Sequence, residues 1–285
     1  MINKHLTILT ILICLFIGLS LQAEVLLELF GQPRQGELLK GKLSGEVDSI
    51  LLDNQPVALN DSIFYLGFSR DAEVDHKLFL QFSNGDTITT KFKIWPKQYK
   101  ISEINTLPKK YTNTKPNKKR LARINREQEE REQIFHNISC NELLYAREYI
   151  RPVPEARIST TYGAQRILNG VARKPHYGVD VAIAKGTPVK AMASGIVVLA
   201  ADFYYNGKYI IIDHGLGISS HYMHLSKMMI KQGDIVKAGD FIGAVGSTGR
   251  STGPHLHWGL RWIDDFMDPE SVFNLDESFL VMRKQ

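Results

Sequence analysis

Residues 251–258 read Ser-Thr-Gly-Pro-His-Leu-His-Trp. Side chains alternate between the two faces of a β-strand, so on a strand His255 and His257 would point to the same face, about 7 Å apart. Such a pair is suited to metal binding or acid–base catalysis, although an isolated His-x-His is more often two half-exposed residues. Six of the nine histidines lie between residues 176 and 257. This clustering favours a functional site.

A second motif lies upstream, where His176-Tyr177-Gly178-Val179-Asp180 offers a ring nitrogen and a carboxylate four residues apart. One more nitrogen, from His255 or His257, would complete a three-ligand site. Three protein ligands with an open fourth position are typical of catalytic zinc. The chain has no His-Glu-x-x-His motif, which excludes the commonest zinc protease design. From the residues alone, the choice between His255 and His257 stays open.

We expect different positions and roles for the other histidines. Strand alternation would turn His224 toward the same groove as the His-x-His pair. His221 is an odd number of residues from His224 and would therefore face the opposite side. His214 adjoins a turn, and we expect a hydrogen-bonded structural role for it. His76 lies far upstream and is expected to be a surface residue rather than a ligand.

The pattern over residues 24–100 is β. Leu78, Leu80 and Phe82 alternate with other residues up to an Asn84-Gly85 hairpin turn, and a second alternating run follows. We interpret this region as a small β-sandwich without chemistry of its own. Residues 152–275 combine glycine turns with β-branched runs and predict a compact antiparallel β domain, followed by a short closing helix and a C-terminal tail, residues 276–285.

Residues 101–151 differ in composition. Eight Lys or Arg and no acid lie in residues 109–126, several glutamates follow, and Asn117 can cap a helix. We expect a solvated, partly helical linker with internal ion pairs and no nucleic-acid site. The fold class is therefore mainly β, with a helical linker between two β domains.

The first 23 residues are typical of a secretory signal. Lys4 precedes an uncharged apolar run that ends at Ala23. We expect export to the periplasm or cell envelope, with membrane attachment only if the segment stays as an anchor. Its removal would leave Cys140 as the single cysteine, so no internal disulfide is expected. The formal net charge of +5 is modest and suits an anionic polymer such as a cell wall.

Three motifs together resemble the lysostaphin-like (LytM-type) zinc metallopeptidases, which cut peptidoglycan cross-links. They are His176-x-x-x-Asp180, Tyr222-Met223-His224-Leu225 and Gly253-Pro254-His255-Leu256-His257. The resemblance covers about residues 157–273. The upstream β domain and charged linker resemble a Gram-negative envelope subgroup of that family.

This resemblance implies a role for each residue. His176, Asp180 and His257 would hold Zn²⁺, with water in the fourth position. His255 would orient or deprotonate that water, and His224 would donate to the oxyanion of the tetrahedral intermediate. The implied partner is peptidoglycan, and in a Gram-negative envelope the natural substrate is the D-alanyl-diaminopimelate cross-link.

Other interpretations remain at this stage. Some relatives of this family are non-catalytic regulators that bind and activate another wall hydrolase, although here all five site positions are occupied. The spacing of the glycines is also similar to that in lipoyl or biotinyl carrier domains. A wall-binding module without catalysis is a third alternative. A regulatory envelope protein is a possible partner, and we expect residues 24 to about 150 to restrain the catalytic domain or to dock it to such a partner.

Overall fold

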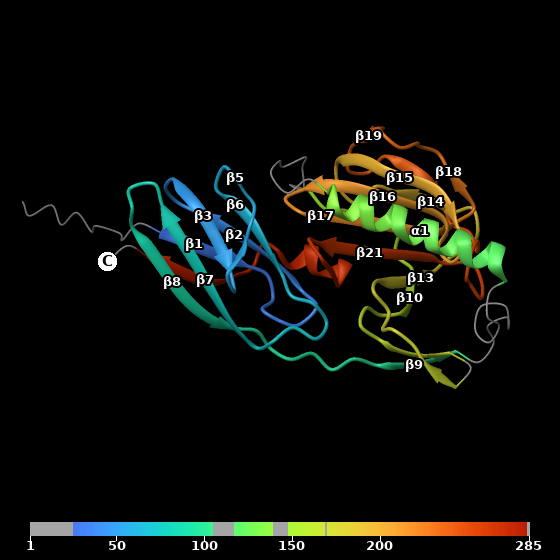
Figure 1. Ribbon diagram of the computed structural model, residues 1–285, viewed down its shortest axis with the longest axis horizontal. Helices are drawn as coiled ribbons and strands as arrows, with labels where there is room; N and C mark the ends of the chain where they lie inside the picture. The colour runs from blue at the N-terminus through green and yellow to red at the C-terminus, as the bar shows by residue number, and fades with distance from the viewer. Residues whose placement is uncertain (1–24, 105–116, 139–147, 169, 284–285) are drawn as a thin grey trace, which may run out of the picture.

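The computed structural model describes residues 25–104, 117–138, 148–168 and 170–283. It is mostly β, with one α-helix among these residues, between an N-terminal β region and a C-terminal β domain (Figure 1). The expected signal segment, the first part of the basic stretch and Cys140 lie outside the described residues. No helix in the described part of the chain is long and apolar enough to cross a membrane.

Two sheets form the N-terminal region. Their strands are β1 (Val25–Phe30), β2 (Leu38–Leu43), β3 (Val47–Leu52), β4 (Gln55–Pro56), β5 (Leu59–Asn60), β6 (Ile63–Gly67), β7 (Asp75–Phe82) and β8 (Thr87–Lys93). One sheet has the order β23-β1-β2-β6-β5 and the other β4-β3-β7-β8. Side chains of both sheets share one apolar core, as a sandwich requires.

The β7–β8 hairpin follows from its sequence pattern. Every second residue of β7 is buried, with Leu78 and Leu80 fully so, and the strand pairs with β8 through the predicted turn. Gly85 has a φ of 88° in that turn, a conformation that costs glycine little. The predicted alternation and hairpin are confirmed.

His76 is not the surface residue we expected. It lies on the inward face of β7, where its Nδ1 is 2.7 Å from Asp53 Oδ2 and its Nε2 2.8 Å from the Glu73 carbonyl oxygen. Its ring also packs on Phe68, with 4.5 Å between centroids. The alternation of β7 turns His76 inward. Both of its ring nitrogens have hydrogen-bond partners there, so burial leaves neither nitrogen unpaired.

The C-terminal residues are not a tail. Residues 278–283 form strand β23 (Ser278–Arg283), which pairs antiparallel with β1 and returns the end of the chain to the N-terminal sheet (Figure 1). Phe279, Leu280 and Met282 pack against the core there. The pairing covers the backbone of β1, which would otherwise be an exposed sheet edge.

The C-terminal domain is built on one long sheet with the order β10-β13-β21-β17-β16-β15-β19, and β22 pairs with β21. Its strands are β10 (Arg157–Thr160), β13 (Val179–Ala182), β15 (Gly195–Phe203), β16 (Gly207–Gly215), β17 (Ile218–Leu225), β19 (Ile235–Val236), β21 (Leu256–Trp262) and β22 (Asp265–Met267). A short helix, η2 (Pro269–Asn274), follows β22, as expected.

Two small sheets complete this domain. One contains β14 (Pro188–Lys190), β20 (Phe241–Ala244) and β18 (Lys227–Met228), and the other β12 (Val171–Ala172), β11 (Gln165–Leu168) and β9 (Ile101–Ile104). The long sheet is antiparallel, as expected. The β9–β11 pair is parallel, so a strand from the expected linker belongs to this domain.

Helix α1 (Lys118–His136) begins after the predicted cap, Asn117, whose Oδ1 accepts a 2.9 Å hydrogen bond from the Arg120 amide. The helix is less solvated than expected, because it covers one face of the long sheet (Figure 1). Ile134 and Phe135 pack on a cluster from β15 and β16, and the buried Glu127 accepts from the Tyr204 amide at 2.7 Å.

His214 has the structural role expected for it. It is buried, its Nδ1 donates to the Ser194 carbonyl oxygen at 2.7 Å, and its Nε2 lies 2.7 Å from Ser220 Oγ. The carbonyl only accepts, so the hydrogen of the neutral ring is on Nδ1. Burial lowers the pKa of His214 to about 4.

This lowered pKa gives a stability prediction. An unfolded histidine titrates near 6.5, so the neutral His214 supports the fold fully above that pH and loses its contribution as the pH falls to 4. The difference between the two pKa values corresponds to about 3 kcal/mol of unfolding free energy. Denaturant unfolding between pH 7 and 4, with a chelator present, should therefore show a shallower acid slope for His214→Gln than for wild type. Equal slopes would refute this account of His214.

Candidate metal centre

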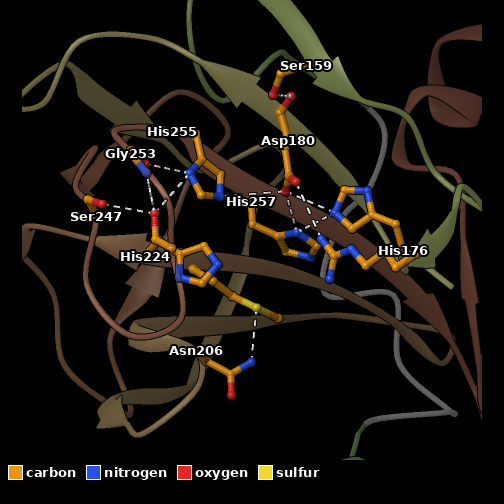
Figure 2. A network of polar contacts seen from close by, with 12 residues as sticks. Ser159, His176, Asp180, Asn206, His224, Ser247, Gly253, His255 and His257 are labelled. Atoms are coloured by element: carbon orange, nitrogen blue, oxygen red, sulfur yellow. Dashed lines mark hydrogen bonds and ion pairs between the residues drawn. The ribbon is translucent and has the colours of Figure 1, made fainter. Parts of the chain in front are cut away.

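Strand register brings the two motifs together. β13 and β21 are neighbours, and Asp180 lies directly opposite His257. His176 precedes β13, and its Nε2 is 2.9 Å from Asp180 Oδ1 and 2.9 Å from His257 Nδ1, while His257 Nδ1 is 2.8 Å from the same carboxylate oxygen (Figure 2). These three buried residues form a cluster that could hold a metal ion.

The donor chemistry of this cluster fits a cation. His176 Nδ1 is 3.1 Å from the Thr161 carbonyl oxygen, which only accepts, so the hydrogen of the neutral ring is on Nδ1. The lone pair of Nε2 then faces the Asp180 carboxylate and the second imidazole. Three electron-rich atoms this close repel one another unless a cation or a proton lies among them.

The protonation states also suit metal binding. Burial lowers the pKa of His176 to about 4. Burial alone would raise the pKa of Asp180, but the neighbouring imidazoles, His176 before His257, hold that pKa well below its usual value. At neutral pH His176 is therefore neutral and Asp180 ionised, as a metal ligand must be.

Gly178, between the two upstream ligands, allows the strands to approach. A Cβ atom there would lie 2.6 Å from the Trp258 carbonyl oxygen and 2.7 Å from His257 Nε2. Both distances are shorter than van der Waals contact permits. A larger residue at this position would push β21, and with it His257, away from Asp180.

Two further histidines border the cluster (Figure 2). His255 donates from Nδ1 to the Gly253 carbonyl oxygen at 2.8 Å, and its Nε2 is 3.8 Å from Asp180 Oδ1. His224 donates from Nδ1 to the Thr248 carbonyl oxygen at 2.8 Å, and its ring centroid is 4.8 Å from that of His255. Each neutral ring therefore keeps Nε2 free of hydrogen.

His224 does not reach the site by strand alternation. Met223 and His221 lie opposite His257 and Gly259, so it is His221 that shares the face of His257. His224 has a φ of 62°, a left-handed conformation that breaks the alternation and turns its side chain to the cluster. The prediction that His221 faces away from the His-x-His is therefore wrong. Its ring is covered by Phe135 of α1, at 5.7 Å between centroids, and it is outside the cluster.

The sequence interpretation missed Arg166. This residue lies on β11, and its Nη2 is 3.5 Å from Asp180 Oδ2, the carboxylate oxygen that faces away from the two histidines. Its Nε is buried without a hydrogen-bond partner among the described residues. No periodic pattern marks Arg166, because its contact with Asp180 joins strands of two different sheets.

Comparison with known proteins finds a family match for the segment that carries this cluster. Residues 174–269 match the model of peptidase family M23. The peptidoglycan DD-endopeptidase ShyA of Vibrio cholerae is 43% identical over 106 residues, which cover 36% of this chain and 24% of that protein. The DD-carboxypeptidase/endopeptidase Mpg of Neisseria meningitidis is 39% identical over 123 residues, covering 43% of this chain and 28% of the relative.

A solved structure extends the similarity to both domains. The crystal structure of an M23 peptidase from Pseudomonas aeruginosa superposes with a TM-score of 0.67 at 27% identity. The alignment covers 86% of this chain and 97% of the other. The two curated relatives are matched over less than a third of their own lengths.

Proposed function

Since the C-terminal domain of this chain belongs to peptidase family M23, we propose that the protein is a zinc-dependent endopeptidase that hydrolyses the peptide cross-links of peptidoglycan. The observation that carries the proposal is the convergence of His176, Asp180 and His257 with two more histidines beside them. The names of the two Gram-negative relatives, which state peptidoglycan or DD-peptidase activity, support the substrate class.

We assign the zinc to His176 Nε2, Asp180 Oδ1 and His257 Nδ1, the three atoms that face one another. Bound there, zinc would supply Lewis-acid polarisation of the scissile carbonyl and lower the pKa of a bound water to about 7. The hydrogen bond from His176 to Thr161 keeps that ring in the tautomer that presents a lone pair.

His255 is the proposed general base. Its Nδ1 hydrogen is committed to the Gly253 carbonyl oxygen, so Nε2 is free to accept a proton from the attacking water. Nε2 lies beside the cluster, 3.8 Å from Asp180 Oδ1. An imidazole has the basicity that proton transfer near neutral pH needs.

His224 is assigned to stabilise the negative charge that develops on the carbonyl oxygen. Its Nδ1 hydrogen is already donated to Thr248, so it can donate from Nε2 only as the imidazolium. Burial, followed by the neighbouring His255 and His257, lowers its pKa to about 3 in the metal-free site. A developing oxyanion next to Nε2 would favour the protonated form, and the proton would come from the attacking water by way of the adjacent His255, whose ring centroid is 4.8 Å away.

The proposed substrate bond is the D-alanyl-diaminopimelate cross-link, and the proposed location is the periplasm. Digestion of purified Gram-negative peptidoglycan with the zinc-loaded protein should convert cross-linked dimeric muropeptides to monomers and leave the glycan strands intact. Mass spectrometry of the products would measure this. Release of the peptide stem from muramic acid would instead show an amidase, and the absence of any product would favour a non-catalytic regulator.

A further inference from the structure

One short segment contacts both upstream metal ligands. In residues 161–166, the Gly163 amide donates to the His176 carbonyl oxygen at 2.8 Å, and the His176 amide donates to the Ala164 carbonyl oxygen at 2.9 Å. The Thr161 carbonyl oxygen accepts from the His176 ring, and Arg166 faces the Asp180 carboxylate. The backbone and side-chain positions of His176 therefore both depend on this segment.

The N-terminal part of the chain holds the same segment from its other side. Arg70, just after β6, donates from Nε to the Gly163 carbonyl oxygen at 2.7 Å, and its guanidinium lies 4.7 Å from the centre of the Tyr99 ring. The Tyr99 ring lies directly on Gly163, where a Cβ atom would come within 2.1 Å of it. The Gln165 amide donates to the Lys100 carbonyl oxygen at 2.9 Å.

Strand pairing extends this contact. β9 leaves the N-terminal domain and pairs in parallel with β11, with Ser102 opposite Arg166. A continuous series of contacts thus runs from Arg70 and Tyr99 through Gly163 to His176. A parallel series runs from β9 through Arg166 to Asp180.

We propose that the N-terminal domain is a structural part of the metal centre and that Arg70 is a positioning residue for it. Through Gly163, Arg70 sets how firmly His176 is held for the metal. Partners that orient metal ligands typically change metal affinity 10–100-fold when they are removed. Arg70 acts one contact further out, so we expect a smaller effect of the same sign. The inference rests on the zinc site of the proposed function but not on which bond is cut.

This role gives a different prediction from the restraint expected from the sequence. Removing residues 24–150 would take away Arg70, Tyr99 and β9, and it would also remove β1, the partner of β23. We therefore expect no gain of activity from such a truncation.

The test compares two variants of neighbouring residues in the full chain. Arg70→Met removes the hydrogen bond to Gly163. Asp71→Asn removes only the exposed ion pair between Arg70 and Asp71 and leaves Arg70 on Gly163. In a chelator competition titration, Arg70→Met should raise the zinc dissociation constant about 3–10-fold, whereas Asp71→Asn should leave it unchanged, since only the former removes a partner of the ligand-bearing segment.

The outcomes separate this inference from the proposed function. Wild-type zinc affinity in Arg70→Met, or an equal loss in Asp71→Asn, would overturn the positioning role. If Arg70→Met does not fold by circular dichroism, Arg70→Lys serves instead, because lysine keeps the charge but lacks the planar fork over Tyr99. The lysine variant should show an intermediate loss, and wild-type affinity in it would also overturn the inference. A wild-type chain that binds no zinc would overturn the proposed function itself.

Discussion

The His257→Ala variant should lose most of its bound zinc and nearly all peptidoglycan cleavage. His257 Nδ1 is one of only three ligand atoms in the cluster, and its loss leaves His176 and Asp180, two ligands for an ion that needs at least three from the protein. The affinity should fall by more than the roughly 10–100-fold that outer partners of metal ligands contribute. Metal analysis of the purified variant, with a muropeptide assay on the same sample, measures both effects.

The matched control for this variant is His136→Ala. His136 is an exposed histidine in the last turn of α1, so its replacement removes an imidazole without touching the cluster. It should retain wild-type zinc content and activity. Normal zinc content in His257→Ala would refute the ligand assignment, whatever happens to activity.

The His255→Ala variant should separate rate from metal binding. Its Nε2 is 3.8 Å from Asp180 Oδ1 and outside the three-atom cluster, so the zinc should remain. Loss of a general base typically costs about 10²–10⁴-fold in rate. Zinc content and the rate of dimeric muropeptide cleavage, determined on one preparation, would show the two effects separately.

His224→Ala provides the comparison for His255→Ala. It should also keep zinc and lose rate, by about 10²–10³-fold if His224 stabilises the oxyanion as proposed. Loss of zinc in His255→Ala would mean that His255 is a ligand. Unchanged rates in both variants would remove the two histidines from the mechanism.

Local patterns sufficed for much of the fold. The alternation along β7, its hairpin turn and the Asn117 cap of α1 were all predictable, because each depends on residues a few positions apart. The mainly β class followed from the same short-range periodicities. His76 shows the limit of this reasoning. The alternation of β7 could predict its inward position, but not its hydrogen-bond partners Asp53 and Glu73.

The sequence by itself determined the β7–β8 hairpin, the helix start and the crowding of histidines in the C-terminal domain, because periodicity and capping are local properties. Only the tertiary structure decided which atoms meet. The β13–β21 register places Asp180 opposite His257, the left-handed conformation of His224 turns its side chain inward, and Arg166 of β11 reaches Asp180. Likewise, β23 joins β1 across the whole chain. Long-range register and single backbone reversals leave no periodic trace in the sequence, since they arise from packing between segments far apart along the chain.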